Sequence, residues 1–70
     1  MARIDIKFSE NEFSRACEYA RQTAKAQKRE LRVYHYAYNV SGGFYFVADT
    51  FYKHKVNECL IATFHNVWDQ

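Results

Sequence analysis

The sequence predicts a small α+β domain with the order β-α-β-β-α, in which a three-stranded antiparallel or mixed sheet carries both helices on one face. Three observations predict this class: an alternating N-terminal segment, a stretch with helical spacing, and two aromatic, β-branched segments around the only two glycines. The chain of 70 residues is expected to form one compact domain over 1–70. Its 49% hydrophobic and 19% aromatic residues supply the apolar material that such a small core needs.

The N-terminal part of the chain predicts a strand followed by a long helix. Over residues 3–8, isoleucine and phenylalanine alternate with charged residues, which is the period of a strand. Ser9 and Glu12 then have the spacing of a capping box, in which each side chain bonds the other residue's backbone N–H. A helix is expected over residues 10–29. Its apolar stripe repeats every three or four residues: Phe13, Ala16, Cys17, Ala20 and Ala24.

The segment 31–51 predicts a β-hairpin with a two-residue turn at Gly42 and Gly43. That turn pairs Ala37 with Ala48. One face of the hairpin then holds the alanine pair and its neighbours, namely Val33, His35, Ala37, Phe44, Phe46 and Ala48. The other face holds most of the tyrosines: Tyr34, Tyr36, Tyr38, Tyr45, Val47 and Phe51. A three-residue loop would reverse the faces of the second strand.

The paired alanines decide where the helix is expected to pack. Ala37 and Ala48 leave room for a helix whose own contact positions are alanines. The helix is therefore predicted to pack on the hairpin face that holds these two residues. The tyrosine face is then left toward solvent or a partner.

The C-terminal segment 56–68 fits two types of secondary structure. Helical spacing connects Val56, Cys59, Leu60, Thr63, Phe64 and Val67. Strand alternation connects Cys59, Ile61, Thr63, His65 and Val67. The helix is preferred because its spacing runs for three turns and no glycine or proline turn precedes it.

The chain carries no motif for catalysis, metal binding or phosphate binding. Its histidines and cysteines lack the spacing of metal ligands, so neither an enzyme nor a metal or cofactor site is expected. Cys17 and Cys59 are expected to be reduced and buried in a cytoplasmic protein, because the N-terminus lacks the apolar segment of a signal peptide. No stretch approaches the ~20 apolar residues of a membrane span, so no membrane partner is expected.

The function is therefore expected to depend on surfaces. Tyrosine is enriched at protein interfaces, and basic residues cluster on the predicted helix, although the helix dipole also favours cations at its end. The candidate partner-binding residues are Tyr34, Tyr36, Tyr38, Tyr45, Phe51, Arg15, Arg21, Lys25 and Lys28. A net charge of +2 is too small to require nucleic acid.

A nucleic-acid-binding transcriptional regulator is the alternative function. Residues 3–9, followed by a helix, resemble the opening of ribbon-helix-helix repressors up to about Thr23. The tyrosines of the hairpin also suit stacking on unpaired bases.

The C-terminal third of the chain suggests a more specific partner. From Gly43 onward the chain resembles the strand-then-helix unit of small phage anti-CRISPR inhibitors, over less than half of its length. The run 58–70 contains the pattern Phe-x-Asn-x-Trp-x-Gln, similar to a helix of a type II inhibitor: Phe64, Asn66, Trp68 and Gln70.

The resemblance implies a phage protein in the cytoplasm of a bacterial host. Such a protein binds and blocks a host defence protein or ribonucleoprotein complex. With a net charge of +2, contact with an acidic or apolar patch is expected rather than mimicry of DNA. The target and the oligomeric state, including a homodimer, stay open.

Overall fold

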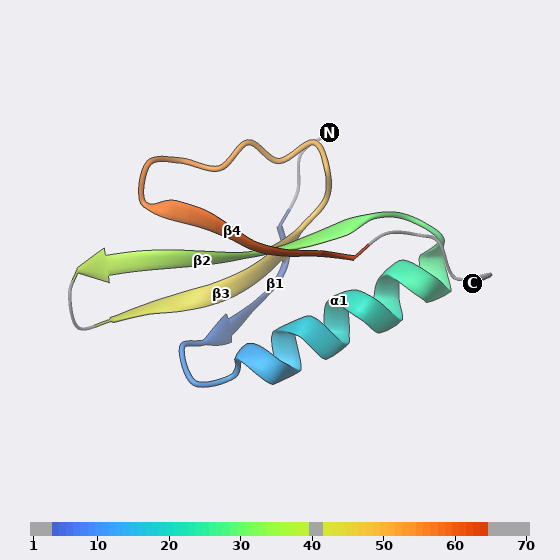
Figure 1. The fold of residues 1–70 in the computed structure, drawn as a ribbon, viewed down its shortest axis with the longest axis horizontal. Helices are drawn as coiled ribbons and strands as arrows, with labels where there is room; N and C mark the ends of the chain where they lie inside the picture. Colours follow the sequence, from blue (N-terminus) through green and yellow to red (C-terminus); the bar gives the residue numbers. More distant parts are fainter. Residues whose placement is uncertain (1–3, 40–41, 65–70) are drawn as a thin grey trace.

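The structure is a computed structural model that describes residues 4–39 and 42–64. These residues form one helix and four strands in the order β1 (Ile4–Ser9), α1 (Phe13–Gln27), β2 (Leu31–Asn39), β3 (Gly42–Ala48) and β4 (Glu58–Phe64). The strands make one antiparallel sheet of order β1-β3-β2-β4, with β2 and β3 in the centre. Figure 1 shows α1 on one side of this sheet and the long β3–β4 connection on the other side.

The predicted α+β class is confirmed, but the predicted number of elements is wrong. The described residues have four strands and one helix, where three strands and two helices were expected. The difference arises in the C-terminal segment, where Glu58–Phe64 is a strand rather than part of a helix over 56–68. β4 pairs with the edge of β2 that the hairpin leaves open. Residues 65–68 of the predicted helix lie outside the described residues.

The helix side of the core between α1 and the sheet is built on small side chains, as the sequence predicts, but the predicted pair of Ala37 and Ala48 is not on the sheet side of this core. Ala16, Ala20 and Ala24 are at most 1% exposed and contact a cluster that includes Leu31, Val33 and Val47. Because residues four apart share one face of a helix and alanine is short, α1 approaches the sheet closely.

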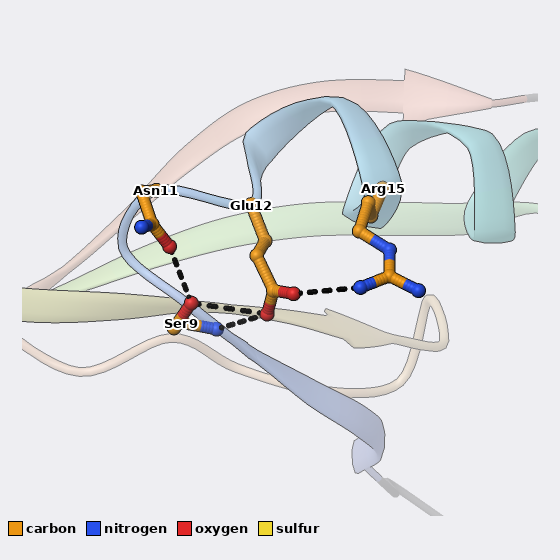
Figure 2. Close-up of polar contacts among 4 residues, drawn as sticks. All are labelled: Ser9, Asn11, Glu12 and Arg15. Carbon is orange, nitrogen blue, oxygen red and sulfur yellow. Dashed lines mark hydrogen bonds and ion pairs between the residues drawn. The ribbon is translucent and has the colours of Figure 1, made fainter.

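The helix is shorter at both ends than the predicted range 10–29. Glu12 is the N-cap, and α1 ends where Lys28 takes a left-handed conformation with φ 53°. Only half of the predicted capping box forms. The backbone N–H of Ser9 donates to the carboxylate of Glu12 at 3.1 Å, whereas the Ser9 hydroxyl donates to side chains of the same turn (Figure 2).

The predicted register of the hairpin is wrong. Gly42 and Gly43 belong to β3 and neither has a positive φ, so they do not form the turn. Ala48 pairs with Arg32 instead of Ala37, which is a displacement of five positions (37 − 32).

A displacement by an odd number of residues moves the whole second strand to the opposite face. Val47 therefore packs toward α1, while Phe46 and Ala48 lie on the other side. The residues of the first hairpin strand, β2, lie on the faces that were predicted for them.

Candidate functional site

Aromatic rings cover the sheet face opposite α1. They form two stacked pairs, one of Tyr34 with Phe46 at 5.2 Å between ring centroids and one of Tyr36 with Phe44 at 5.0 Å. Each pair consists of residues directly opposite in the β2–β3 register. Side chains in such positions are close enough to contact, so the register itself builds this surface.

The connection between β3 and β4, residues 49–57, covers part of this face, and we call it the strap. Tyr52 of the strap packs edge to face with both Tyr34 and Phe46, with 5.4 Å between ring centroids in each pair. Tyr34 is consequently only 1% exposed and Phe46 is fully buried. The strap thus divides the aromatic face into a covered half and an open half.

A short set of hydrogen bonds holds the strap. The hydroxyl of Tyr52 donates to Glu58 Oε1 at 2.6 Å, and the backbone N–H of Lys55 donates to the same oxygen at 2.8 Å. Burial and the bond to Glu58 raise the pKa of Tyr52 to about 12, so the phenol keeps its proton at neutral pH. The backbone N–H of Ala37 donates to the carbonyl of Asn57 at 3.1 Å.

The open half, formed by Tyr36, Tyr38 and Phe44, is named the aromatic strip. Tyr38 is 60% exposed and packs edge to face with Tyr36, with 5.5 Å between ring centroids. Lys7 of β1 lies with its Nζ 5.2 Å from the centroid of the Phe44 ring. The strip therefore combines stacked rings, one strongly exposed tyrosine and an adjacent cation.

Only two of the five predicted aromatic site residues, Tyr36 and Tyr38, belong to the strip. Tyr34 lies beneath the strap, so the prediction that it is exposed is wrong. Tyr45 lies on the helix side, where its ring contacts Phe13 at 5.1 Å. Phe51 lies on the strap and is 67% exposed.

The predicted basic residues lie elsewhere on the molecule. All four are exposed on α1 or at its C-cap: Arg15, Arg21, Lys25 and Lys28. Arg15 also pairs with Glu12 at 2.9 Å (Figure 2). Hydrogen bonds from Ser9, followed by the guanidinium of Arg15, lower the pKa of the Glu12 carboxyl. Apart from Tyr45, the predicted aromatic residues thus lie on the side of the sheet opposite α1 and its basic residues.

Two members of the open surface, Lys7 and Phe44, escaped the sequence prediction. The alternation of β1 does separate Lys7 from Ile6 and Phe8, which indicates that Lys7 points away from the helix. Its position beside Phe44 depends on the pairing of β1 with β3, two strands separated by the helix and β2. Such long-range pairing has no local sequence signal.

Within residues 4–39 and 42–64, no three residues of His, Cys, Asp or Glu gather as metal ligands, and the surface has no pocket. No helix there is long and apolar enough to cross a membrane. Both cysteines are free, as expected, but only Cys17 is partly buried, and its burial raises the pKa of its thiol. The expectation that Cys59 is buried is wrong.

Residues 43–70, on which the expected resemblance to anti-CRISPR inhibitors depends, are described only up to residue 64. Phe64 lies in β4 and packs against the core under α1, so it is not a helical residue. Asn66, Trp68 and Gln70 lie outside the described residues. Comparisons with protein-family models, with curated proteins and with solved structures found no match.

Proposed function

We propose that this chain is a non-enzymatic binding protein that blocks a partner protein through its aromatic strip. The observation that carries the proposal is the exposure of Tyr38, 60%, at the end of a row of contacting rings. A large exposed ring that continues into a wider aromatic patch is a common feature of interaction sites.

Two rings of the strip are packed against each other before any partner binds. Tyr36 stacks on Phe44 with 16° between the ring planes, and Tyr38 lies against both rings. Because the side chains of Tyr36 and Phe44 lose little rotamer freedom on binding, more of the contact energy remains available for affinity. Tyrosine also offers a hydroxyl at the rim of an otherwise apolar contact.

The chemistry of the strip defines the partner surface. Three aromatic rings favour an apolar patch, and Lys7 beside Phe44 favours an acidic residue at its edge. From the sequence pattern of residues 58–70 alone, we propose a host defence protein or ribonucleoprotein complex as this partner.

Affinity capture with matched variants tests the proposal. Tagged wild-type protein, Tyr38→Ser and Phe51→Ser serve as baits in nuclease-treated bacterial lysate, since Tyr38 and Phe51 are similarly exposed at 60% and 67%. A partner of the strip is retained by the wild type and by Phe51→Ser. We expect Tyr38→Ser to weaken its binding by about 2 kcal/mol, or roughly 30-fold in Kd. Equal retention by all three baits contradicts the proposal.

Nucleic acid is the second candidate ligand, because Lys7 and exposed Tyr38 both border Phe44. A cation beside rings on a sheet suits single-stranded nucleic acid, whose bases stack on aromatic side chains. Titration with a fluorescent oligonucleotide at about 50 and 200 mM salt separates the two candidates, because phosphate contacts are strongly salt-dependent. Sub-micromolar affinity at ~150 mM salt favours nucleic acid over a protein partner.

A further inference from the structure

We propose that the interaction surface continues beneath the strap, which opens while the sheet stays folded and so lets Tyr34 and Phe46 bind an apolar segment of the partner protein. The identity of the partner rests on the proposed function. The opening of the strap does not, and it can be measured on the isolated protein.

The covered and open halves of the aromatic face are continuous. Phe44 of the strip contacts Phe46 at 6.0 Å between ring centroids, and Phe46 stacks on Tyr34. The strap covers one end of this row, Tyr34 and Phe46, mainly through the ring of Tyr52. When the strap moves away, the strip of three rings gains two more on the same face of the same two strands.

The strap is attached to the sheet by few contacts. Tyr52 and His54 are its residues with rings against Tyr34, while Val56 is 98% exposed and Phe51 67%. The sheet beneath is held differently, by a buried cluster with α1 and by backbone pairing of its central strands on both sides. Segments with few buried contacts and exposed backbone open at lower free energy than the core does.

The chemistry under the strap selects an apolar protein segment. The covered cluster consists of Tyr34, Phe46 and Ala48, which carry no charge. Arg32, directly opposite Ala48 and hydrogen-bonded with Tyr34, borders this cluster but is already paired with Glu30 at 3.1 Å. The phosphates of a nucleic acid would need cations that are not already paired with a carboxylate, whereas an aliphatic or aromatic side chain can fill the site of Tyr52.

Native-state hydrogen exchange of the wild-type protein tests the opening. The backbone N–H of Ala37 reports on the end of the strap that joins β4, because it donates to the carbonyl of Asn57 at 3.1 Å, one position beyond the pairing of Tyr36 with Glu58. The amide of Val47, in the central strand β3, reports on the sheet. We expect the Ala37 amide to exchange at least 100-fold faster than that of Val47, at a rate that does not respond to low urea concentrations. Exchange of both amides at one rate, with the same urea dependence, overturns the proposal.

Two neighbouring substitutions then separate opening from general destabilisation. Tyr52→Ala removes the ring that covers the sheet, and Phe51→Ala removes an exposed ring from the same strap. With Tyr52→Ala we expect at least a tenfold faster exchange of the Ala37 amide, increased fluorescence of the dye 8-anilinonaphthalene-1-sulfonate, and a circular dichroism spectrum of a folded sheet. Phe51→Ala should match the wild type in amide exchange, in dye fluorescence and in its circular dichroism spectrum.

Two results of this experiment contradict the inference. If Tyr52→Ala unfolds the whole sheet, the strap is part of the cooperative core and does not open separately. If Tyr52→Ala raises the affinity for a single-stranded oligonucleotide at ~150 mM salt, the covered face accepts nucleic acid, and the apolar protein segment is the wrong occupant.

Discussion

Replacing Gly43 by alanine should destabilise the protein much more than the same change at Gly42. A Cβ atom at position 43 would clash with the carbonyl oxygen of Tyr36 and would lie 2.9 Å from Nε2 of His35. The oxygen belongs to the backbone of β2, which is paired on both sides and cannot move aside without breaking the sheet. A Cβ at position 42 meets only the ring of Tyr38, at 3.2 Å.

The expected magnitudes follow from these contacts. Overpacking of a well-packed site costs about 1–3 kcal/mol, and the fixed backbone oxygen of Tyr36 puts Gly43→Ala near 3 kcal/mol. For a chain of this size that lowers Tm by about 15 °C. The ring of Tyr38 is exposed and can rotate away from position 42. Alanine also restricts the unfolded chain, so Gly42→Ala should stay within about 0.5 kcal/mol of the wild type.

Urea denaturation followed by circular dichroism measures both changes, with thermal melts as a second readout. The midpoint should fall for Gly43→Ala while the m-value stays constant, as is expected when only stability changes. The reasoning is refuted if Gly43→Ala is as stable as Gly42→Ala, because β2 and β3 would then not approach each other at position 43. It is also refuted if Gly42→Ala proves the more damaging change.

Three further predictions concern single side chains. The folded-state pKa of Glu12 lies below its usual value, so its contribution to stability is present above pH ~4.5 and is lost as the pH falls through the folded pKa; Glu12→Gln should flatten this part of a stability profile measured between pH 3 and 7. Lys28→Gly should stabilise the protein by up to about 1 kcal/mol in urea titrations, because Lys28 has φ 53° and glycine adopts that conformation without steric cost; a loss of stability would contradict this assignment. Tyr34→Ala should cost about 3–5 kcal/mol and Tyr38→Ala less than about 1 kcal/mol, since only the first ring is buried; equal costs in thermal melts would show that the strap does not cover Tyr34.

Patterns within one element predicted the first half of the fold. The alternation of residues 3–8 and the alanine spacing of the helix each report which side chains share a face of one element. β1 and the buried stripe Ala16, Ala20 and Ala24 are therefore found where the sequence places them. The ends of α1 moved by a few residues, because a cap depends on the local conformation of the turn as well as on residue types.

The C-terminal segment shows why local patterns were insufficient there. Its apolar residues fit both the spacing of a helix and that of a strand over a short stretch, and the longer helical run favoured the wrong type. The choice depends on what the segment packs against. The edge of β2 offers unpaired backbone groups that only a strand can bond, and Glu58–Phe64 pairs with it.

The sequence by itself determined that this protein is an α+β chain with a helix on an alanine stripe and a tyrosine-rich second strand. The tertiary structure alone decided which aromatic residues are exposed. Side chains alternate with a period of two, so the five-position change in hairpin register moved Phe44 and Phe46 to the tyrosine side and Tyr45 to the helix. The strap then covered Tyr34 and left Tyr38 open, through contacts between residues far apart in the chain.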